Sequence, residues 1–356
     1  MNYYFFDHDT YDRLYNCSML TEAQWEAKKR PNWVGAVHLT LGTIYQILYL
    51  IFLTAMWQKQ YWSHSCYKLM FVLGISDLCA TVIGGTFCGI FSLRGDIFCT
   101  NQNLVYLVGC CQASFWSAAC ITGLILLINR TLDLADDRIA NQLFGGAKTY
   151  IWFIFPAGSF FYMWFYTTPF LFSAIVDASF LNPYLGIPEI KIDMAVYDNF
   201  YCLIHNYAVA AIYPFMYLIM MILLWKKSRG GVVTTKQKQI ILQSVIVSLL
   251  LAITAVTYMV MQYIPTPVYM PIIVHFMWQG SHGASVFTYI FVNKSMKKEA
   301  TKIVKRFLFN LHCGTPGTNS VHHISTSVNT TVPAEQTIQK DQKHSSVIHD
   351  YEDQFF

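Results

Sequence analysis

The sequence predicts an all-α membrane protein: a seven-transmembrane helix bundle followed by a short amphipathic eighth helix. Of its 356 residues, 54% are hydrophobic and only 12% are charged, whereas soluble domains carry about 25% charged residues. The apolar residues form uncharged runs at least as long as the ~20 residues that cross a bilayer as a helix. In hydrocarbon, a helix satisfies its own backbone polar groups. A soluble fold is therefore excluded, and no nucleic-acid partner is expected.

Four regions follow from the hydropathy pattern. Residues 1–32 are a polar amino-terminal tail without the apolar core of a cleavable signal peptide, so the first span must act as the targeting signal. Residues 33–293 form the seven-transmembrane domain, 294–311 the amphipathic helix and 312–356 a disordered cytoplasmic tail. The expected spans cover about 33–57, 69–93, 102–131, 149–176, 201–225, 239–262 and 269–292.

Two spans have features of their own. Residues 239–293 contain no Asp, Glu, Lys or Arg and are too long for one crossing, so we divide them at Pro265 and Pro267. The fourth span holds Pro156 and Pro169, which we interpret as kinks that a membrane helix tolerates.

The third span is predicted to be the central helix. It has no charged side chain before Arg130, and small residues recur along it at helical spacing. Small residues let helix backbones approach closely in lipid. The small positions are Gly109, Ala113, Ser117, Cys120 and Gly123.

Basic residues gather in the loops on one side of the predicted bundle, including Lys226, Lys227, Lys236 and Lys238. The positive-inside rule then places the amino terminus outside and the carboxyl terminus in the cytosol, although the cluster at 28–30 opposes this orientation. In this orientation Asn16 is the glycosylation site, while the sequons at 129, 293 and 329 lie elsewhere.

The segment after the last span has an apolar stripe and several lysines, typical of a helix lying on the inner leaflet. Cys313 follows it closely. It is a candidate for palmitoylation, and an unmodified juxtamembrane cysteine is the alternative.

Several motifs together resemble a nematode serpentine chemoreceptor of class T, within the rhodopsin-like G-protein-coupled receptors. Asp77 lies in the middle of span 2, Tyr213-Pro214 falls in span 5, and Asn129-Arg130-Thr131 closes span 3 where such receptors have an acid-Arg-aromatic triplet. Further segments that carry the resemblance are 97–99, 127–130, 143–152 and Trp278-x-x-x-His282-Gly283.

The resemblance implies a receptor with two partners besides the lipid bilayer: a small-molecule ligand and a heterotrimeric G protein. Asn129, Arg130, Thr131 and the basic loop at 226–238 would serve switching and coupling to the G protein. The resemblance also implies the plasma membrane, with the sensory-neuron cilium as one location. Asn129 replaces the usual acid, and span 6 lacks the Trp-x-Pro element, so the switch cannot be copied residue by residue.

Asp77 is the main intramembrane polar candidate. A carboxylate near mid-bilayer costs about 2.5–3.5 kcal/mol on insertion scales and needs partners. By resemblance it would form a polar switch site with Ser117 and His282, with sodium as one occupant. The alternative is a hydrogen-bonded acid that only holds helices together.

Two cysteines are the candidates for a disulfide. Cys99 and Cys202 lie outside at the starts of spans 3 and 5, and a bridge between them would tether the long outer loop to the central span. Cys17 is also outside and competes for Cys99, and the spacing from Cys99 to Arg130 is longer than in rhodopsin-like receptors.

The ligand pocket is expected among the outer halves of spans 3, 5, 6 and 7. Candidate lining residues are Ser114, Tyr258, Gln262, His275 and Gln279. His275, Gln279 and His282 share one helix face, but no third metal ligand is identifiable, so a pocket or packing role is favoured over a metal. Span 7 has no Lys for a retinal Schiff base, and no cofactor is expected.

Other functions remain as alternatives. A seven-span transporter is disfavoured because intramembrane charge is confined to Asp77 and no paired broken helices appear. An enzyme is disfavoured because no nucleophile elbow or His-Glu-x-x-His motif is present. A receptor-like adaptor without signalling is the third alternative.

Overall fold

The computed structural model describes residues 2–229, 235–263, 267 and 269–313. Within these ranges, the side chains at 235–237, 240, 262–263 and 311–313 are left out of the description. The chain divides into two units, residues 1–304 and 305–356, and the helical bundle belongs to the first.

Each predicted span corresponds to a helical segment. They are α4 (Val34–Met56); α6 (Ser65–Thr81) continued by η1 (Val82–Phe87) and α7 (Cys88–Arg94); α8 (Gln102–Ala135); η3 (Gly146–Phe153) continued by α10 (Ile154–Tyr166); α11 (Phe200–Arg229); α12 (Thr235–Tyr263); and α13 (Met270–Phe291). Among the described helices, five are long and apolar enough to cross a membrane, and neither α10 nor α13 is one of them. Helix α10 has only 13 residues, and α13 carries several polar side chains.

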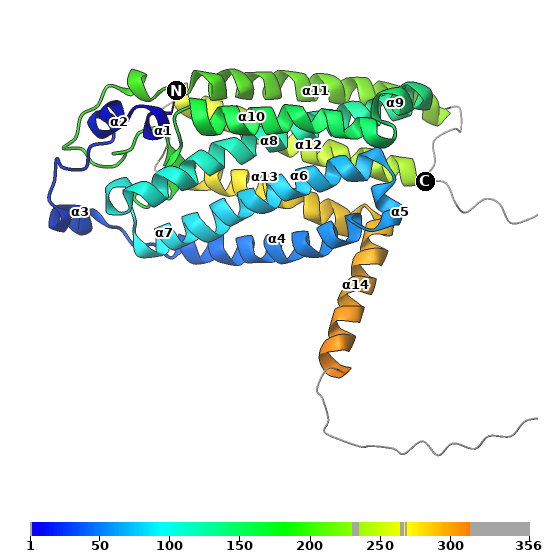
Figure 1. Cartoon of the computed structure of the whole chain (residues 1–356), viewed down its shortest axis with the longest axis horizontal. Helices are drawn as coiled ribbons and strands as arrows, with labels where there is room; N and C mark the ends of the chain where they lie inside the picture. Colours follow the sequence, from blue (N-terminus) through cyan, green and yellow to red (C-terminus); the bar gives the residue numbers. More distant parts are fainter. Residues whose placement is uncertain (1, 230–234, 264–266, 268, 314–356) are drawn as a thin grey trace, which may run out of the picture. The chain divides into compact units, whose positions relative to one another are not determined.

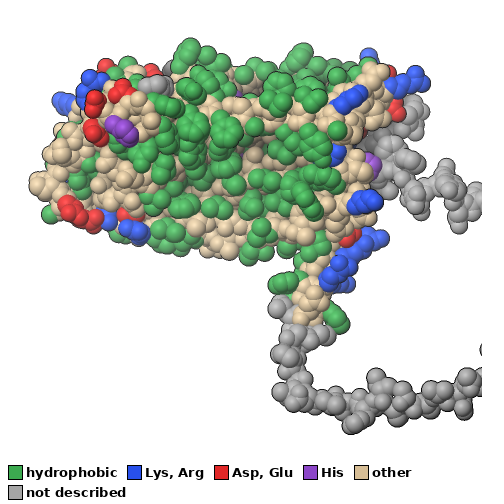
Figure 2. Space-filling view, viewed as in Figure 1, with side chains coloured by type: hydrophobic (Ala, Val, Ile, Leu, Met, Phe, Trp, Pro, Cys, Tyr) green, Lys and Arg blue, Asp and Glu red, His purple; other side chains and the backbone are tan. Residues whose placement is uncertain are grey.

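These segments run alongside one another, with α8 packed against α6, α10, α11 and α12 (Figure 1). Short helices α1 (Tyr3–Phe6), α2 (His8–Leu14) and α3 (Glu22–Lys28) lie at one end, which we call the amino-terminal end (Figure 1). Helices α5 (Lys59–Trp62) and α9 (Asp137–Phe144) lie at the opposite end. Hydrophobic side chains cover the visible flank of the bundle, and charged side chains collect towards its two ends (Figure 2). This distribution fits a bundle that stands across a bilayer.

The small residues of α8 permit the predicted close packing. A Cβ atom on Gly109 would lie 2.1 Å from the Phe170 carbonyl oxygen, and one on Gly123 would lie 2.6 Å from the Tyr213 hydroxyl. That hydroxyl donates a 2.5 Å hydrogen bond to the carbonyl of Cys120. The small face of α8 therefore receives α11 and the chain that follows α10.

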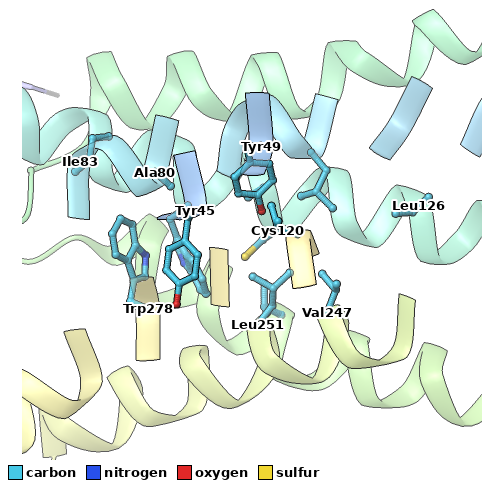
Figure 3. Close-up of a cluster of buried hydrophobic side chains, with 14 of the residues drawn as sticks. Tyr45, Tyr49, Ala80, Ile83, Cys120, Leu126, Val247, Leu251 and Trp278 are labelled. Carbon is cyan, nitrogen blue, oxygen red and sulfur yellow. The ribbon is translucent and has the colours of Figure 1, made fainter. Parts of the chain in front are cut away.

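The core lies between α8 and the helices around it. Figure 3 shows Tyr49 of α4, Cys120 of α8, Leu251 of α12 and Trp278 of α13 pointing into one apolar cluster. All four side chains are buried. Because they come from distant parts of the sequence, this cluster joins the spans into one domain.

The fourth span ends earlier than its predicted limit at residue 176. Helix α10 stops at Tyr166, and Pro169 lies beyond it, outside any helix or strand. Strands β1 (Leu171–Ser173) and β2 (Ala178–Phe180) then form an antiparallel hairpin that pairs Leu171 with Phe180. The apolar run continues beyond Tyr166 because the hairpin strands are buried against the bundle rather than because the helix is longer. Pro156 is the third residue of α10, close to the junction where the 3₁₀ helix η3 continues into α10.

Two short 3₁₀ helices lie in the connections at the amino-terminal end: η2 (Phe98–Thr100) before α8 and η4 (Met194–Tyr197) before α11. Helix α14 (Lys294–Cys313) matches the predicted amphipathic segment. Its first turns bury Met296 and Ala300. The side chain of Cys313, and the tail from 314 onward with Asn329, lie outside the described residues.

Candidate functional site

A buried polar cluster surrounds Asp77 in the middle of the bundle. One carboxylate oxygen lies 2.8 Å from Nδ1 of His282, and the other accepts hydrogen bonds from the Tyr49 hydroxyl at 3.0 Å and the Ser285 hydroxyl at 3.2 Å. The Tyr49 hydroxyl also contacts the carbonyl of His282. These residues come from α4, α6 and α13, so the cluster joins three helices. Both oxygens of the buried acid have partners, as the cost of burying such a group requires.

Ser117 does not belong to this cluster, contrary to the prediction. Its hydroxyl bonds the hydroxyl of Ser159 on α10. Ser117 therefore lies on the face of α8 that packs against α10, and the third helix at Asp77 is α4. Tyr49 is one of two tyrosines in span 1, and nothing in the sequence identified it as a partner of Asp77.

Two tryptophans lie against His282. The rings of Trp116 and Trp278 meet the imidazole edge-on, with centroid distances of 5.8 and 4.9 Å. Trp116 also donates a 2.9 Å hydrogen bond from Nε1 to Oδ1 of Asn206 on α11. The pair thus connects the Asp77 cluster to α8, α11 and α13.

A small cavity of about 30 Å³ lies on these tryptophans, with room for about two water molecules. The described lining residues are Gln112, Ala113, Trp116, Phe170, Cys202, Asn206, Tyr258 and Trp278. None of them is an acid, a base or a histidine. The Tyr258 hydroxyl is buried and has no hydrogen-bond partner among the described residues.

Of the pocket candidates whose side chains are described, only Tyr258 lines this cavity. Ser114 donates a 2.8 Å hydrogen bond back to the Cys110 carbonyl of its own helix. Gln279 is paired with His38 of α4, at 2.7 Å from its Oε1 to the histidine Nδ1 and 3.0 Å from its Nε2 to the histidine carbonyl. The side chain of Gln262 lies outside the described residues.

His275 is buried beside His38, with ring centroids 5.1 Å apart, and stacks on Trp278 at 5.8 Å. Neither of its ring nitrogens has a partner among the described residues. The described part of the chain contains no group of three or more His, Cys, Asp or Glu residues that could hold a metal.

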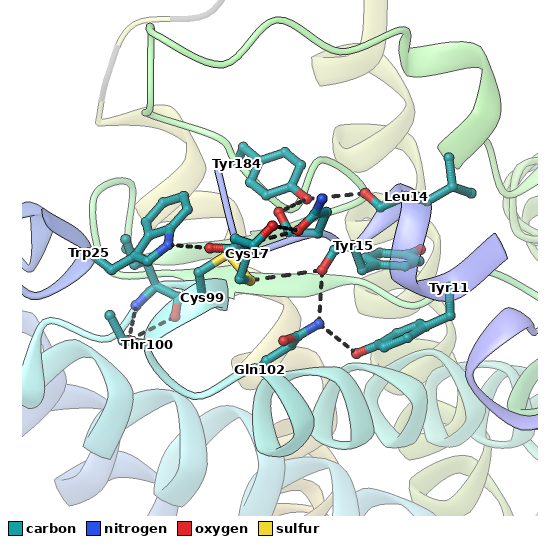
Figure 4. The surroundings of a disulfide bond; sticks show 12 residues. Tyr11, Leu14, Tyr15, Cys17, Trp25, Cys99, Thr100, Gln102 and Tyr184 are labelled. Carbon is teal, nitrogen blue, oxygen red and sulfur yellow. Dashed lines mark hydrogen bonds between the residues drawn. A yellow bond between two sulfur atoms is a disulfide. The ribbon is translucent and has the colours of Figure 1, made fainter. Parts of the chain in front are cut away.

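The predicted disulfide between Cys99 and Cys202 is wrong. Cys99 is bonded to Cys17 of the amino-terminal segment (Figure 4), and Cys202 is a free, buried thiol. Cys202 packs against Ala113, which at ~1.5 Å per residue lies about 16 Å along α8 from its first residue. Cys99 precedes that first residue, so Cys202 is too deep in the bundle to reach it.

The amino-terminal segment is folded onto the bundle rather than free. Asn2 is fully buried: its Oδ1 accepts a 2.7 Å hydrogen bond from Tyr106 and its Nδ2 donates a 3.0 Å bond to the Trp164 carbonyl. The rings of Tyr11 and Tyr15 also pack on Tyr106, at 5.1 Å between centroids for each. Burial raises the pKa of Tyr11 to about 12. The segment predicted as a polar tail thus has an aromatic inner face.

The β1–β2 hairpin turns at Asp177, which has a left-handed φ of 46° and is buried. Asn32 donates a 2.5 Å hydrogen bond to its carboxylate, and Ser92 also bonds it. Burial raises the pKa of Asp177, although these hydrogen bonds act in the opposite direction. The other acids of the long connection, Glu189, Asp193 and Asp198, are exposed.

Arg130 lies near the opposite end of α8 and is held by its own helix. Its Nε and Nη2 donate to Oδ1 of Asn129 at 3.1 and 2.7 Å, and its Nη1 lies 3.1 Å from Asp133. Asn129 also donates to Ser65 at 3.3 Å. An acid three residues after the arginine therefore supplies the charge that position 129 lacks, and the i, i+3 spacing was readable in the sequence.

Among the side chains that the structure describes, the other coupling candidates share no hydrogen bond or ion pair with Arg130. Thr131 is buried and donates to the Leu127 carbonyl at 2.8 Å. Lys226 and Lys238 are exposed, Lys227 is half-buried, and the side chain of Lys236 lies outside the described residues. Asn16 is half-exposed, whereas Asn129 and Asn293 are buried.

Comparisons with known proteins agree with this architecture. Residues 1–311 match the family model described as "Serpentine type 7TM GPCR chemoreceptor Srt". The chain belongs to the Srt family of serpentine chemoreceptors. It is therefore a multi-pass membrane protein of the G-protein-coupled receptor type, as the sequence predicted.

One curated Srt relative is Serpentine receptor class T-55 of Caenorhabditis elegans, 23% identical over 301 residues that cover 82% of this chain and 80% of the relative. Among solved structures, squid rhodopsin matches with a TM-score of 0.59 and 13% sequence identity, over 83% of this chain and 88% of that one. At this identity the match shows the seven-helix fold alone. The Srt chain thus shares the seven-helix receptor fold.

Proposed function

We propose that this Srt chain is a chemosensory receptor of the plasma membrane that binds a small extracellular ligand and activates a heterotrimeric G protein. The observation that carries the proposal is that the cavity, the two tryptophans and the Asp77 cluster are in contact one after another. A ligand that occupies the cavity contacts Trp116 and Trp278, and both of these rings rest on His282. Ligand binding can therefore bias the packing of α8 against α13.

The G protein would bind at the opposite end, around Arg130. This guanidinium is held only by residues of α8 among those described, at Asn129 and Asp133. Breaking these contacts requires no movement of another helix, so a small shift at the end of α8 would free the arginine for a partner. The basic ends of α11 and α12 would meet the G protein and anionic lipid in the same plane.

Nucleotide exchange on a G protein tests the proposal. Membranes with wild-type or Arg130→Ala receptor are screened with volatile and water-soluble compounds, with Arg138→Ala as the matched control because Arg138 is an exposed arginine of α9. We expect ligand-dependent exchange in the wild type and in Arg138→Ala, and at least a tenfold loss in Arg130→Ala at equal surface expression. Ligand-driven solute flux without exchange would overturn the receptor proposal in favour of a transporter.

A further inference from the structure

We propose that the cavity on the two tryptophans selects small uncharged compounds that carry a hydrogen-bond-accepting oxygen, such as short ketones. The inference rests on the proposed receptor function for its biological meaning, but the chemistry of the site can be tested without a G protein.

The lining excludes charged ligands. Its described residues are aromatic, aliphatic, thiol and amide side chains, and none of them is an acid, a lysine, an arginine or a histidine that could pair with a carboxylate or an ammonium group. The nearby acid, Asp77, already has its oxygens bonded by Tyr49, Ser285 and His282. A charged ligand would lose its hydration without finding a counterion, which costs several kcal/mol even after relaxation.

The lining also offers hydrogen-bond donors whose N–H or O–H groups are not all paired with an acceptor among the described residues. The Tyr258 hydroxyl is buried and unpartnered among the described residues. Among the described residues, Nδ2 of Asn206 donates a single weak hydrogen bond, at 3.8 Å to the Cys202 sulfur, although it carries two N–H groups, and its Oδ1 accepts from Trp116. Leaving a buried donor unsatisfied costs about 1–3 kcal/mol, so a ligand oxygen that accepts from these groups would be favoured over a hydrocarbon.

The walls of the cavity limit the size of the ligand. The rings of Trp116, Trp278 and Phe170, the last just before the hairpin, form part of the wall of this cavity of about 30 Å³. A ligand of a few carbon atoms can enter by displacing water and turning side chains, whereas a large one would have to separate the helices.

Cys202 provides a reporter because this free thiol lines the cavity. Methyl methanethiosulfonate, which is uncharged, transfers its methylthio group to the cysteine sulfur as a mixed disulfide. Methanesulfinate leaves, and the thiol proton passes to the buffer. Peptide mass spectrometry of purified full-length receptor then gives the labelling rate at Cys202. We expect labelling by this reagent, and at least tenfold slower labelling by the analogues with a sulfonate or trimethylammonium group. Equal rates for the charged reagents, or no labelling by the uncharged one, would overturn the proposal.

Three probes of similar size test the ligand class directly: 2-pentanone, butyrate and pentylammonium. We expect 2-pentanone to slow the labelling of Cys202 and the two ions to leave it unchanged. Tyr258→Phe should require a roughly fivefold to tenfold higher concentration of 2-pentanone for the same protection, the loss expected for one hydrogen bond. Tyr162→Phe, which removes an exposed tyrosine hydroxyl of α10, is the matched control and should not change it.

The stability of the unliganded variant separates a ligand contact from a structural one. Tyr258→Phe deletes an unsatisfied hydroxyl, so its Tm should equal or exceed that of the wild type. A lower Tm, protection by the ions, or equal protection of Tyr258→Phe and wild type by 2-pentanone would each overturn the proposal. Protection without any nucleotide exchange would instead leave this site intact and count against the G-protein function.

Discussion

The carboxylate of Asp77 depends on His282 more than on its other partners. The imidazole is the one described group within hydrogen-bond distance of Oδ1, whereas Oδ2 has both Tyr49 and Ser285. We therefore predict that His282→Ala lowers the free energy of unfolding by about 1–3 kcal/mol, because it leaves a buried acceptor unpaired. Thermal unfolding of the purified receptor in detergent measures the change.

Ser285→Ala is the matched control for this prediction. It removes a 3.2 Å hydrogen bond from an oxygen that keeps Tyr49 as a partner, so the free energy of unfolding should fall by only about 0.5–1.5 kcal/mol. If the serine variant were destabilised as much as the histidine variant, the conclusion that Asp77 depends more on His282 than on its other partners would be refuted.

Asp177 should make the hairpin sensitive to pH. Burial raises its pKa in the folded receptor above the ordinary value of 3.8, so the folded state binds the proton more tightly than the unfolded state. Its contribution to stability is then fully present below pH 3.8 and is lost as the pH rises through the raised folded pKa. Asp177→Asn removes the ionisation and suits the left-handed φ of 46°.

The predicted result is a higher Tm for Asp177→Asn than for the wild type at about pH 7, with a gap that narrows towards about pH 4. Asp193→Asn, an exposed acid of the same connection, should show no such gap. A gap that widened on acidification would contradict the direction of the pKa shift.

The helices α1–α3 act as one element because Cys17 ties them to the start of α8 (Figure 4). The bridge spans 82 residues of sequence. Removing a disulfide of this kind costs about 2–4 kcal/mol, since it frees the unfolded chain. We predict this loss for Cys17→Ser, measured as a lower Tm that added dithiothreitol does not lower further.

The cysteine variants also distinguish the two pairings. Cys99→Ser, alone or combined with Cys17→Ser, should match the single Cys17→Ser variant, and Cys202→Ser should keep the wild-type response to reductant. Recovery of an unreduced peptide that joins Cys99 to Cys202 would disprove the bridge described above.

The orientation of the receptor in the membrane is a property of the whole molecule. The amino-terminal end carries the disulfide and the half-exposed sequon at Asn16, and the basic loops lie at the other end. An outside amino terminus therefore predicts a glycan on Asn16. Asn16→Gln should then remove an endoglycosidase-sensitive mass shift on a gel, whereas Asn293→Gln should not, because Asn293 is buried. A glycan that persists in Asn16→Gln would argue for another site or the reverse orientation.

Most of the fold could be predicted from the sequence, because in a membrane the helices are set by long uncharged runs. The third span, predicted at 102–131, is α8 at Gln102–Ala135, and the seventh, predicted at 269–292, is α13 at Met270–Phe291. The wrong prediction of where the fourth span ends has the same cause. Hydropathy reports burial, and the buried strand at Leu171–Ser173 is as apolar as a helix.

What the tertiary structure alone decided is which side chains meet. The family resemblance grouped Asp77 with His282, which the structure confirms, and with Ser117, which it does not. Tyr49 could not be identified, because nothing in the sequence distinguishes it among the 23 tyrosines of the chain. Similarly, Cys17, Cys99 and Cys202 were all candidates for the disulfide in the sequence. The structure excludes Cys202, because this residue packs beside Ala113, deep in the bundle, while Cys17 bonds Cys99. Spacing along a chain fixes the position of a residue on its own helix, whereas contacts between helices depend on the tilt and rotation set by packing of the whole bundle.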